Sequence, residues 1–377
     1  MRHQIFRIAS QKRSRDCILR PFFDNVTRSL SQNSSQSERP SFGVAFDIDG
    51  VILLGHTPVG GSPRALRRLY DDLGALKIPY VFLTNGGGFP ESRRAAELSE
   101  ILGINILPSQ VIQGHSPFKQ LVNRFENEFV IAVGKGEPAA VMTEYGFKNV
   151  LSIDEYSSYF DGIDPLTPYK MWTAREIGNG VKTERGDVVS KRVQAAFVLS
   201  DPVDWSRDIQ VLCDVLRTGG LPGREMGDQP YIYFANDDLE YQANFPTERL
   251  GMAAFRIALE AIYNRIHCNP LVYTSYGKPN PLVFKNAEKV LGSLLHRDKP
   301  SHHIPEQFNT LYMVGDNPKV DIRGAQQAGA PWFSILTRTG VFKGKQNHQE
   351  FPADVVVDTV EEAVDFILRR ENAPLTL

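Results

Sequence analysis

Short apolar runs that end at polar residues constrain the fold of this chain more than any other sequence feature. These runs, each with the polar residues at its end, are 43–46 with Asp47 and Asp49, 79–83 with Thr84 and Asn85, and 310–314 with Asp316. Helical patterns alternate with the runs, and a β-α-β-α alternation predicts a parallel sheet covered by helices. Because ligands bind at the carboxyl ends of such strands, we expect these polar groups to meet at one sheet edge.

Amphipathic segments supply the helices of this prediction. The first begins at Ser62 and Pro63, which form a helix start signal. It carries Leu66, Leu69 and Leu73 on one face, so we expect it to extend to Leu73. Further helices are predicted at 90–102, at 281–295, at 321–328 and, behind a capping box of Thr359 and Glu362, at the C-terminal end.

The middle of the chain is a different unit. Segment 116–270 has strands and helices of its own, separated by loops rich in Gly, Asp and Glu. We therefore expect a sheet domain formed by 40–115 and 271–377, into which 116–270 is inserted as a second α/β domain. Near and within the insertion, His115 is expected at the surface or at a hinge, and Lys135 in a strand-end turn between two glycines.

The first 39 residues differ from the rest in composition. They are rich in Arg and Ser, poor in acids, and lack the continuous apolar stretch of a secretory signal. This composition predicts a mitochondrial transit peptide, with a basic tail that has no targeting role as the alternative.

Charge, hydropathy and cysteine content exclude several classes of protein. Lys plus Arg number 42 and Asp plus Glu 44, and the net charge of −2 gives no whole-chain signature of nucleic-acid binding. No run approaches the ~18 apolar residues that span a bilayer, so no transmembrane segment is predicted. Three widely spaced cysteines exclude a disulfide scaffold and a zinc ribbon.

The acidic residues at the strand ends indicate a metal site. Two neighbouring carboxylates, Asp47 and Asp49, repel each other, so either one is protonated or a cation lies between them. Asp316 brings a third carboxylate to the same edge, which favours the cation. Oxygen ligands without a His or Cys cluster favour Mg²⁺.

These residues closely resemble the motifs of the haloacid dehalogenase superfamily of phosphotransferases. The matching pieces, spread over roughly residues 40 to 370, are Asp47-Ile-Asp49-Gly50-Val51, Thr84-Asn85, Gly277-Lys278-Pro279 and Gly315-Asp316-Asn-Pro-Lys-Val-Asp321. The resemblance implies a Rossmann-like parallel-sheet core with an inserted α/β cap domain. It also implies a Mg²⁺-dependent phosphatase that hydrolyses a small phosphorylated metabolite through an aspartyl-phosphate.

The resemblance assigns a role to each matching residue. Asp47 would attack phosphorus, and Asp49 would protonate the leaving alcohol and then activate water. Asp47, Asp316 and the backbone carbonyl of Asp49 would hold Mg²⁺. Thr84, Asn85 and Lys278 would bind the phosphoryl group, with Lys278 also neutralising charge. Asp321 would orient Lys278 or metal-bound water.

Spacing and family likeness locate the cap. The stretch between Asp49 and Thr84 has room for only one helix, whereas the insertion 116–270 lies between Thr84 and Lys278. In the superfamily that this sequence resembles, an insertion at this place is a C2-type cap, as in nitrophenyl phosphatases and pyridoxal phosphatase. In the cap, Asn236 and Asp237 would lie in a substrate loop, and Arg249 is a candidate for binding an anionic or carbonyl group of the leaving moiety.

The C2-capped subgroup nearest to this sequence also implies a cellular setting. It is associated with mitochondria, and some fungal relatives suggest a link to glycerophospholipid synthesis. The matrix is favoured over the membrane, the cytoplasm is the alternative location, and C2-capped relatives imply a homodimer formed through the cap. Two other functions remain open: a non-catalytic binding or scaffold protein with the same fold, and a phosphorylated receiver-like module, which the large insertion fits poorly.

Overall fold

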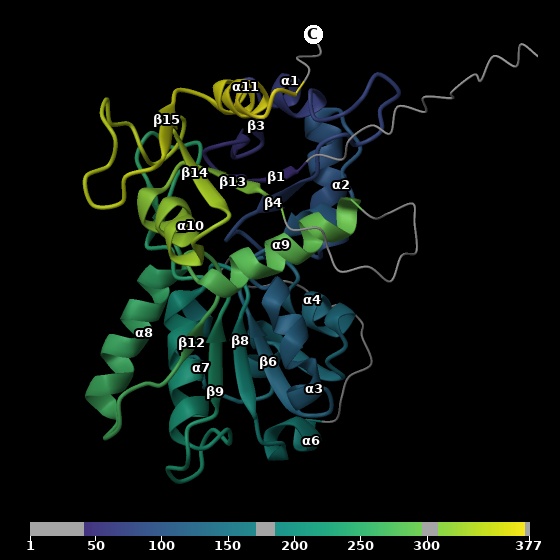
Figure 1. The fold of residues 1–377 in the computed structure, drawn as a ribbon. Helices are drawn as coiled ribbons and strands as arrows, with labels where there is room; N and C mark the ends of the chain where they lie inside the picture. The colour runs from purple at the N-terminus through teal and green to yellow at the C-terminus, as the bar shows by residue number, and fades with distance from the viewer. Residues whose placement is uncertain (1–40, 171–184, 296–307, 374–377) are drawn as a thin grey trace, which may run out of the picture. The chain divides into compact units, whose positions relative to one another are not determined.

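The structure is a computed structural model that describes residues 41–170, 185–295 and 308–373 (Figure 1). The predicted targeting segment, 1–39, lies outside the described residues. Within the described ranges, no helix combines the length and the apolar composition needed to cross a bilayer.

The first sheet has six parallel strands in the order β15-β14-β13-β1-β4-β5. Its strands are β1 (Phe42–Phe46), β4 (Tyr80–Leu83), β5 (Val111–Ile112), β13 (Thr310–Gly315), β14 (Trp332–Thr337) and β15 (Val355–Val357). Its helices are α1 (Ser62–Arg67), α2 (Glu91–Leu102), α9 (Pro281–Leu295), α10 (Arg323–Ala328) and α11 (Val360–Arg370). Strands β1 and β13 lie at its centre, so the ends that carry Asp47 and Asp316 are neighbours.

Alternate side chains of the central strands pack on opposite faces of this sheet. In β13, Tyr312 and Val314 belong to the cluster that includes α1, α2 and α11, whereas Leu311 and Met313 pack with α9 and α10. Every residue of β1 and β4 is buried, as expected for strands covered on both faces. Helices α1 and α11 lie side by side on the same face (Figure 1).

The second sheet has five parallel strands in the order β12-β9-β8-β6-β7. They are β6 (Phe129–Val133), β7 (Asn149–Ser152), β8 (Ala195–Val198), β9 (Tyr231–Phe234) and β12 (Thr274–Ser275). Its helices are α3 (Val122–Phe125), α4 (Pro138–Tyr145), α5 (Ile153–Ser158), α6 (Arg185–Ser190), α7 (Trp205–Arg217) and α8 (Met252–Ile266). Strand β12 pairs with β9 although it follows the boundary expected at 270, and the predicted domain boundaries stay predictions.

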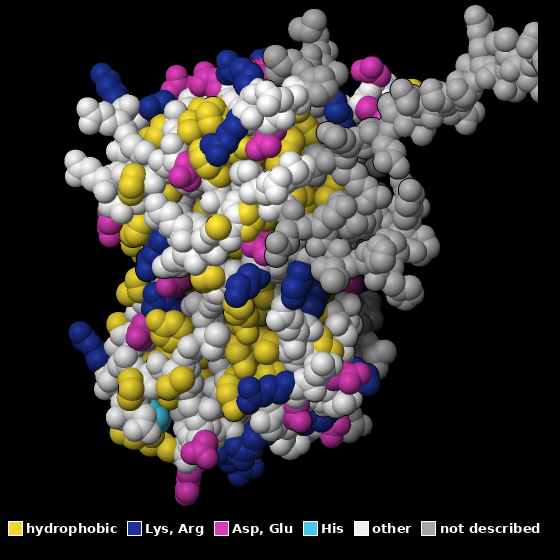
Figure 2. Space-filling model, viewed as in Figure 1, with side chains coloured by type: hydrophobic (Ala, Val, Ile, Leu, Met, Phe, Trp, Pro, Cys, Tyr) yellow, Lys and Arg dark blue, Asp and Glu magenta, His cyan; other side chains and the backbone are white. Residues whose placement is uncertain are grey.

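Two antiparallel hairpins extend from these layers. They are β2 (Leu53–Leu54) with β3 (Thr57–Pro58), and β10 (Glu240–Tyr241) with β11 (Arg249–Leu250). Lys, Arg, Asp and Glu side chains are interspersed over the face of the molecule that Figure 2 shows, in keeping with the balanced composition.

The predicted extent of the first helix is wrong. Helix α1 ends at Arg67, and Leu73 is 94% exposed. The chain turns after the helix because the Asp71 carboxylate accepts hydrogen bonds from the backbone N–H groups of Leu73 and Ala75. A local Asx turn at Asp71 therefore outweighs the leucine spacing, and Leu73 does not reach the core.

Replacing Thr359 with Ala should destabilise the protein. The Thr359 side chain accepts a hydrogen bond from the backbone N–H of Glu362 at the start of α11. Loss of such a cap costs about 1 kcal/mol, so thermal unfolding should show a lower Tm. Thr359→Ser keeps the hydroxyl and should retain the wild-type Tm; equal Tm values for the Ala and Ser variants would show that the cap contributes nothing.

Candidate active site

Asp47 lies where strand β1 gives way to a tight turn. Its N–H still donates to Val314 O at 2.9 Å, which continues the ladder to β13. The next carbonyl, Ile48 O, then accepts hydrogen bonds from three successive N–H groups, those of residues 51, 52 and 53. Gly50 makes this turn possible, because its φ is +88° and a Cβ there would collide with the Asp316 carboxylate.

Lys278 joins two carboxylates at the centre of the site. Its Nζ lies 2.8 Å from Asp47 Oδ1 and 2.7 Å from Asp321 Oδ1. The Lys278 side chain is only 1% exposed. Burial opposes its charge, but the carboxylates of Asp321 and Asp47 outweigh burial and raise the pKa of the ammonium. Lys278 is therefore a fixed positive charge beside Asp47.

Asp316 and Asp321 complete an acidic group. One ligand oxygen from each of Asp47, Asp316 and Asp321 lies within 4.8 Å of the others. Asp321 Oδ2 accepts hydrogen bonds from the backbone N–H groups of Asp316 (3.1 Å) and Asn317 (3.0 Å), so its two oxygens are engaged in holding Lys278 and the loop. Asp316 Oδ2 accepts from Val341 N at 2.6 Å and faces the cavity.

The charge of this group calls for a further cation. Burial, together with repulsion from Asp321, raises the pKa of Asp316 to about 8. Burial also raises the pKa of Asp47 well above its ordinary value, against the opposing effect of Lys278. One ammonium cannot balance three ionised carboxylates, so the group holds either a proton or a further cation, and an all-oxygen donor set suits a hard divalent ion that displaces the proton. The residues present therefore fit Mg²⁺.

Thr84 and Asn85 follow strand β4, and the structure gives them different surroundings. Thr84 Oγ1 accepts from Gly86 N at 3.0 Å and lines the cavity. The Asn85 amide instead joins two parts of the chain: its Oδ1 accepts from Lys278 N, and its Nδ2 donates to Lys278 O and to Asp238 Oδ1. Both Asn85 amide hydrogens are thus engaged, which leaves no side-chain donor for a phosphoryl oxygen.

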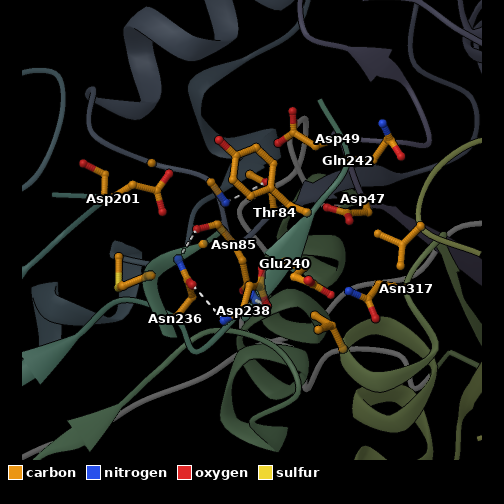
Figure 3. A pocket seen from close by; sticks show the side chains of 18 of the residues that line it. Asp47, Asp49, Thr84, Asn85, Asp201, Asn236, Asp238, Glu240, Gln242 and Asn317 are labelled. Carbon is orange, nitrogen blue, oxygen red and sulfur yellow. Dashed lines mark hydrogen bonds between the residues drawn. The ribbon is translucent and has the colours of Figure 1, made fainter. Parts of the chain in front are cut away.

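A cavity of about 120 Å³ lies over these residues (Figure 3). Its lining residues from the first sheet and its loops include Asp47, Asp49, Thr84, Asn85, Asp316, Asn317 and Val341. Its lining residues from the inserted segment include Lys135, Asp201, Asn236, Asp238, Glu240, Tyr241 and Gln242. Lys278 and Asp321 lie directly behind Asp47, as their bonds show. Burial raises the pKa of Asp49 at the cavity wall, which favours the protonated form that a proton donor needs.

The structure separates the candidate substrate residues of the cap. Asn236 lines the cavity, and its Nδ2 donates to Asn85 O at 2.8 Å. Asp237 does not line the cavity, because its carboxylate forms an ion pair with Arg256, 2.6 Å away. Arg249 is exposed and donates to Thr247 Oγ1, so it also lies outside the cavity lining.

Sequence reasoning missed the place of Lys135 and Asp201 in the cavity wall, whereas Asp238 belongs to the stretch 235–238 that is expected to form a substrate loop. Lys135 and Asp201 follow β6 and β8 and form an ion pair of 2.7 Å at the cavity wall, and Asp238 follows β9. Polar residues after buried parallel strands are the signal that identifies Lys135 and Asp201, as they identify the residues of the first sheet. The expectation of a turn at Lys135 holds, but this turn faces the cavity.

His115, expected from the sequence at the surface or at a hinge, is excluded from the surface by its burial. Its side chain is fully buried rather than at the surface, and its Nδ1 lies 2.7 Å from Tyr145 OH. Burial lowers the pKa of its imidazole to about 4, so the ring is neutral at physiological pH. Tyr145 OH in turn donates to Glu91 Oε1, which links α4 to α2.

Comparison with known proteins now identifies the family. A family model described as haloacid dehalogenase-like hydrolase matches residues 44–148, and a second, described as HAD-hydrolase-like, matches residues 275–363. A mitochondrial hydrolase of Saccharomyces cerevisiae is 33% identical over 358 residues, covering 89% of this chain and 97% of the yeast protein. The chain belongs to the haloacid dehalogenase-like hydrolases.

Other relatives of this haloacid dehalogenase-like hydrolase agree. A cardiolipin synthase (CMP-forming)/mitochondrial hydrolase fusion protein of Schizosaccharomyces pombe is 31% identical over 345 residues, which cover 90% of this chain and 55% of the fusion. The solved 4-nitrophenylphosphatase of Thermotoga maritima has a TM-score of 0.58 at 18% identity, covering 87% of this chain and 97% of that one. The predicted family, fold class and enzyme class are confirmed.

Replacing Gly340 with Ala should weaken divalent-ion binding by this hydrolase. A Cβ at position 340 would collide with the Asp316 carboxylate and displace it. We expect the affinity for Mg²⁺ to fall at least about tenfold, equivalent to about 1.4 kcal/mol, in isothermal titration calorimetry. Gly162→Ala strains the backbone because the φ of Gly162 is +74°, but its Cβ would meet open space away from Asp316, so this control should keep the wild-type affinity. Unchanged binding in Gly340→Ala would contradict a role of Asp316 in holding the ion.

Stabilisation by Mg²⁺ should increase with pH. Because burial and Asp321 raise the pKa of Asp316 to about 8, the folded metal-free protein keeps a proton that the unfolded chain loses near pH 4. The metal-free protein therefore loses stability as the pH rises from about 4 to about 8, and Mg²⁺ must displace that proton. Differential scanning fluorimetry should show a larger Mg²⁺-induced rise in Tm at about pH 8.5 than at about pH 6. Equal rises, or the same pH dependence in Asp316→Asn, would count against this assignment.

Proposed function

We propose that this hydrolase is a Mg²⁺-dependent phosphatase that cleaves a small phosphate monoester through an aspartyl-phosphate on Asp47. The observation that carries the proposal is the buried Lys278 ammonium held between Asp47 and Asp321, with Asp316 beside them. Hydrolysis of phosphate monoesters is among the slowest reactions in water, so a catalyst must combine a nucleophile, proton transfer and charge neutralisation. This site offers all three.

Asp47, Asp316 and the backbone carbonyl of Asp49 would hold Mg²⁺. Bound there, the ion supplies positive charge that offsets the charge of the carboxylates and of the phosphoryl oxygens. Asp321 has a different task, because Lys278 and two backbone N–H groups already engage its oxygens. It fixes the direction of the Lys278 ammonium and the loop that carries Asp316.

The reaction proceeds in two steps on the residues of this chain. An Asp47 carboxylate oxygen bonds to phosphorus while the bond from phosphorus to the alcohol oxygen breaks, and Asp49 gives its proton to that oxygen. Asp49 then takes a proton from water as the water oxygen attacks the aspartyl-phosphate, which releases inorganic phosphate and restores Asp47. The Thr84 hydroxyl and the Lys278 ammonium hold phosphoryl oxygens throughout.

Relatives and the cavity support a small substrate. A phospholysine phosphohistidine inorganic pyrophosphate phosphatase of Mus musculus is 36% identical over 94 residues, 25% of this chain. The fold is also that of a glycerol phosphate phosphatase of Mycobacterium tuberculosis solved with magnesium, with a TM-score of 0.54 and 17% identity. A cavity of about 120 Å³ holds on the order of ten non-hydrogen atoms, at ~10–15 Å³ for each water-sized group.

The cellular setting belongs to this proposal. The yeast relative is named a mitochondrial hydrolase, and the composition of residues 1–39 is that of a transit peptide, so we place the protein in the mitochondrial matrix rather than in the membrane or the cytoplasm. The fission-yeast relative joins a hydrolase to cardiolipin synthase in one chain, which favours a role in glycerophospholipid metabolism. Ile257, Ile262 and Ile266 are exposed on α8, which supports a homodimer through the cap.

Substitution of Asp47 should abolish phosphate release. We expect wild-type protein with Mg²⁺ to hydrolyse 4-nitrophenyl phosphate, and Asp47→Asn to reduce kcat by at least about 10³-fold because the nucleophile is lost. EDTA should remove the wild-type activity, and added Mg²⁺ should restore it. A continuous assay of nitrophenolate at fixed Mg²⁺ measures all three rates.

The control is Asp72→Asn, an equivalent change at an exposed carboxylate outside the cavity lining, which should keep the wild-type rate. Wild-type activity no higher than that of Asp47→Asn across a broad panel of phosphate esters would overturn the proposal. That outcome would favour the alternative of a non-catalytic binding or scaffold protein.

A further inference from the structure

The cavity has two chemically different ends. At the phosphoryl end, Lys278 and the proposed ion supply positive charge. At the opposite wall, the inserted segment contributes Asp201, Asp238 and Glu240 from the loops after β8 and β9 and from the β10–β11 hairpin (Figure 3). In the proposed reaction, this second wall would contact the part of the substrate that leaves as an alcohol.

The positive groups near this wall do not balance its carboxylates. Lys135 is the lining cation, and Asp201 Oδ2 already engages its Nζ at 2.7 Å. Lys343 lies outside the lining and donates to Gln242 Oε1. Lys278 also acts on Asp238, whose pKa it lowers, but its ammonium is paired with Asp47 and Asp321. The N-terminal end of α8 faces Asp238, whose backbone oxygen accepts from Ala253 N.

The carboxylates of Asp238 and Glu240 are not neutralised by an ion pair within the described part of the chain. Asp238 Oδ1 accepts one neutral hydrogen bond, from Asn85 Nδ2 at 2.8 Å, and no ion pair to Asp238 is formed within the described part of the chain. The Glu240 side chain is exposed, and among the same residues no group donates a hydrogen bond to its carboxylate. Both residues line the cavity that holds Asp47. Burial raises the pKa of Asp238 to about 7 against the opposing effect of Lys278, so its carboxylate gains full charge only when a positive group lies beside it. The wall therefore favours hydrogen-bond donors and positive charge over anions.

We propose that Asp238 and Glu240 select phosphate monoesters whose leaving alcohol carries an ammonium group a few atoms from the phosphorus. The inference rests on the proposed phosphatase function and deepens it. An ammonium at this wall would form charge-assisted hydrogen bonds with the two carboxylates. A carboxylate or a second phosphate at the same place would face like charges.

Three esters with the same two-carbon chain test this inference in wild-type protein. They are 2-aminoethyl phosphate, which ends in an ammonium, 2-hydroxyethyl phosphate, which is neutral, and phosphoglycolate, which ends in a carboxylate. We expect kcat/KM to fall in that order, about tenfold at each step and mainly through KM, since an ion pair of this kind is equivalent to about 1.4 kcal/mol. Phosphoglycolate hydrolysed as fast as the amino ester would overturn the inference.

Variants then assign the selectivity to its residues. Asp238→Asn keeps an acceptor for Asn85 Nδ2 and removes the charge, and Glu240→Gln removes the second charge. Each should lower the ratio of kcat/KM for the amino ester to that for the neutral ester by at least about threefold. Glu128→Gln, an equivalent change at an exposed cap residue outside the cavity lining, should keep the wild-type ratio. An unchanged ratio in both Asp238→Asn and Glu240→Gln would contradict their role.

The outcomes separate this inference from the function on which it rests. If 4-nitrophenyl phosphate is hydrolysed but the three esters show no preference, the phosphatase function stands and the selectivity fails. If neither 4-nitrophenyl phosphate nor any of the three esters releases phosphate, the proposed function fails first.

Discussion

The ion pair of Lys278 with Asp47 and Asp321 is the interaction on which the rest of the site depends. Removing an ammonium and two carboxylates from water is costly, and such a group is stable only when close contacts and further hydrogen bonds offset the desolvation. Here Asp321 supplies both, because it binds Lys278 through one oxygen and the backbone of the Asp316 loop through the other. The same contacts leave the site with more negative than positive charge. This excess of negative charge favours the binding of a cation at the site.

Both sheets contribute to the cavity in the same way. In each, buried parallel strands end at one edge, and polar residues follow them there: Asp47 after β1, for example, and Asp201 after β8. The Asn85 amide connects the two edges, since it bonds the backbone of Lys278 and the carboxylate of Asp238. The position of Asp238 is thus tied to that of Lys278, which pairs with Asp47, and a shift of Asp238 would alter the contacts of Lys278.

Much of the fold and the core of the site could be predicted from the sequence, because strand ends in a parallel sheet converge by geometry. Asp47 after β1 and Asp316 after β13 could be placed at this sheet edge without knowledge of contacts between residues distant in sequence. Leu73 shows where periodicity fails, since a turn made by Asp71 ends the helix first. Asp237 and Asp238 show a second limit. They are neighbours in sequence, yet one pairs with Arg256 and the other faces the cavity, and only the position of α8 decides which.

The contrast between the two ends of the cavity follows from the chemistry of phosphoryl transfer. Positive charge is needed where the phosphoryl oxygens lie. A substrate with an anionic leaving group could bind in reverse, with that group in place of the phosphoryl group at the positive end of the cavity. Carboxylates at the cap wall prevent that, because an anion that entered in reverse would meet Asp238 and Glu240. A substrate with phosphate at one end and an ammonium at the other is aligned by the field of the cavity before any close contact forms. Orientation and selectivity then have the same physical origin.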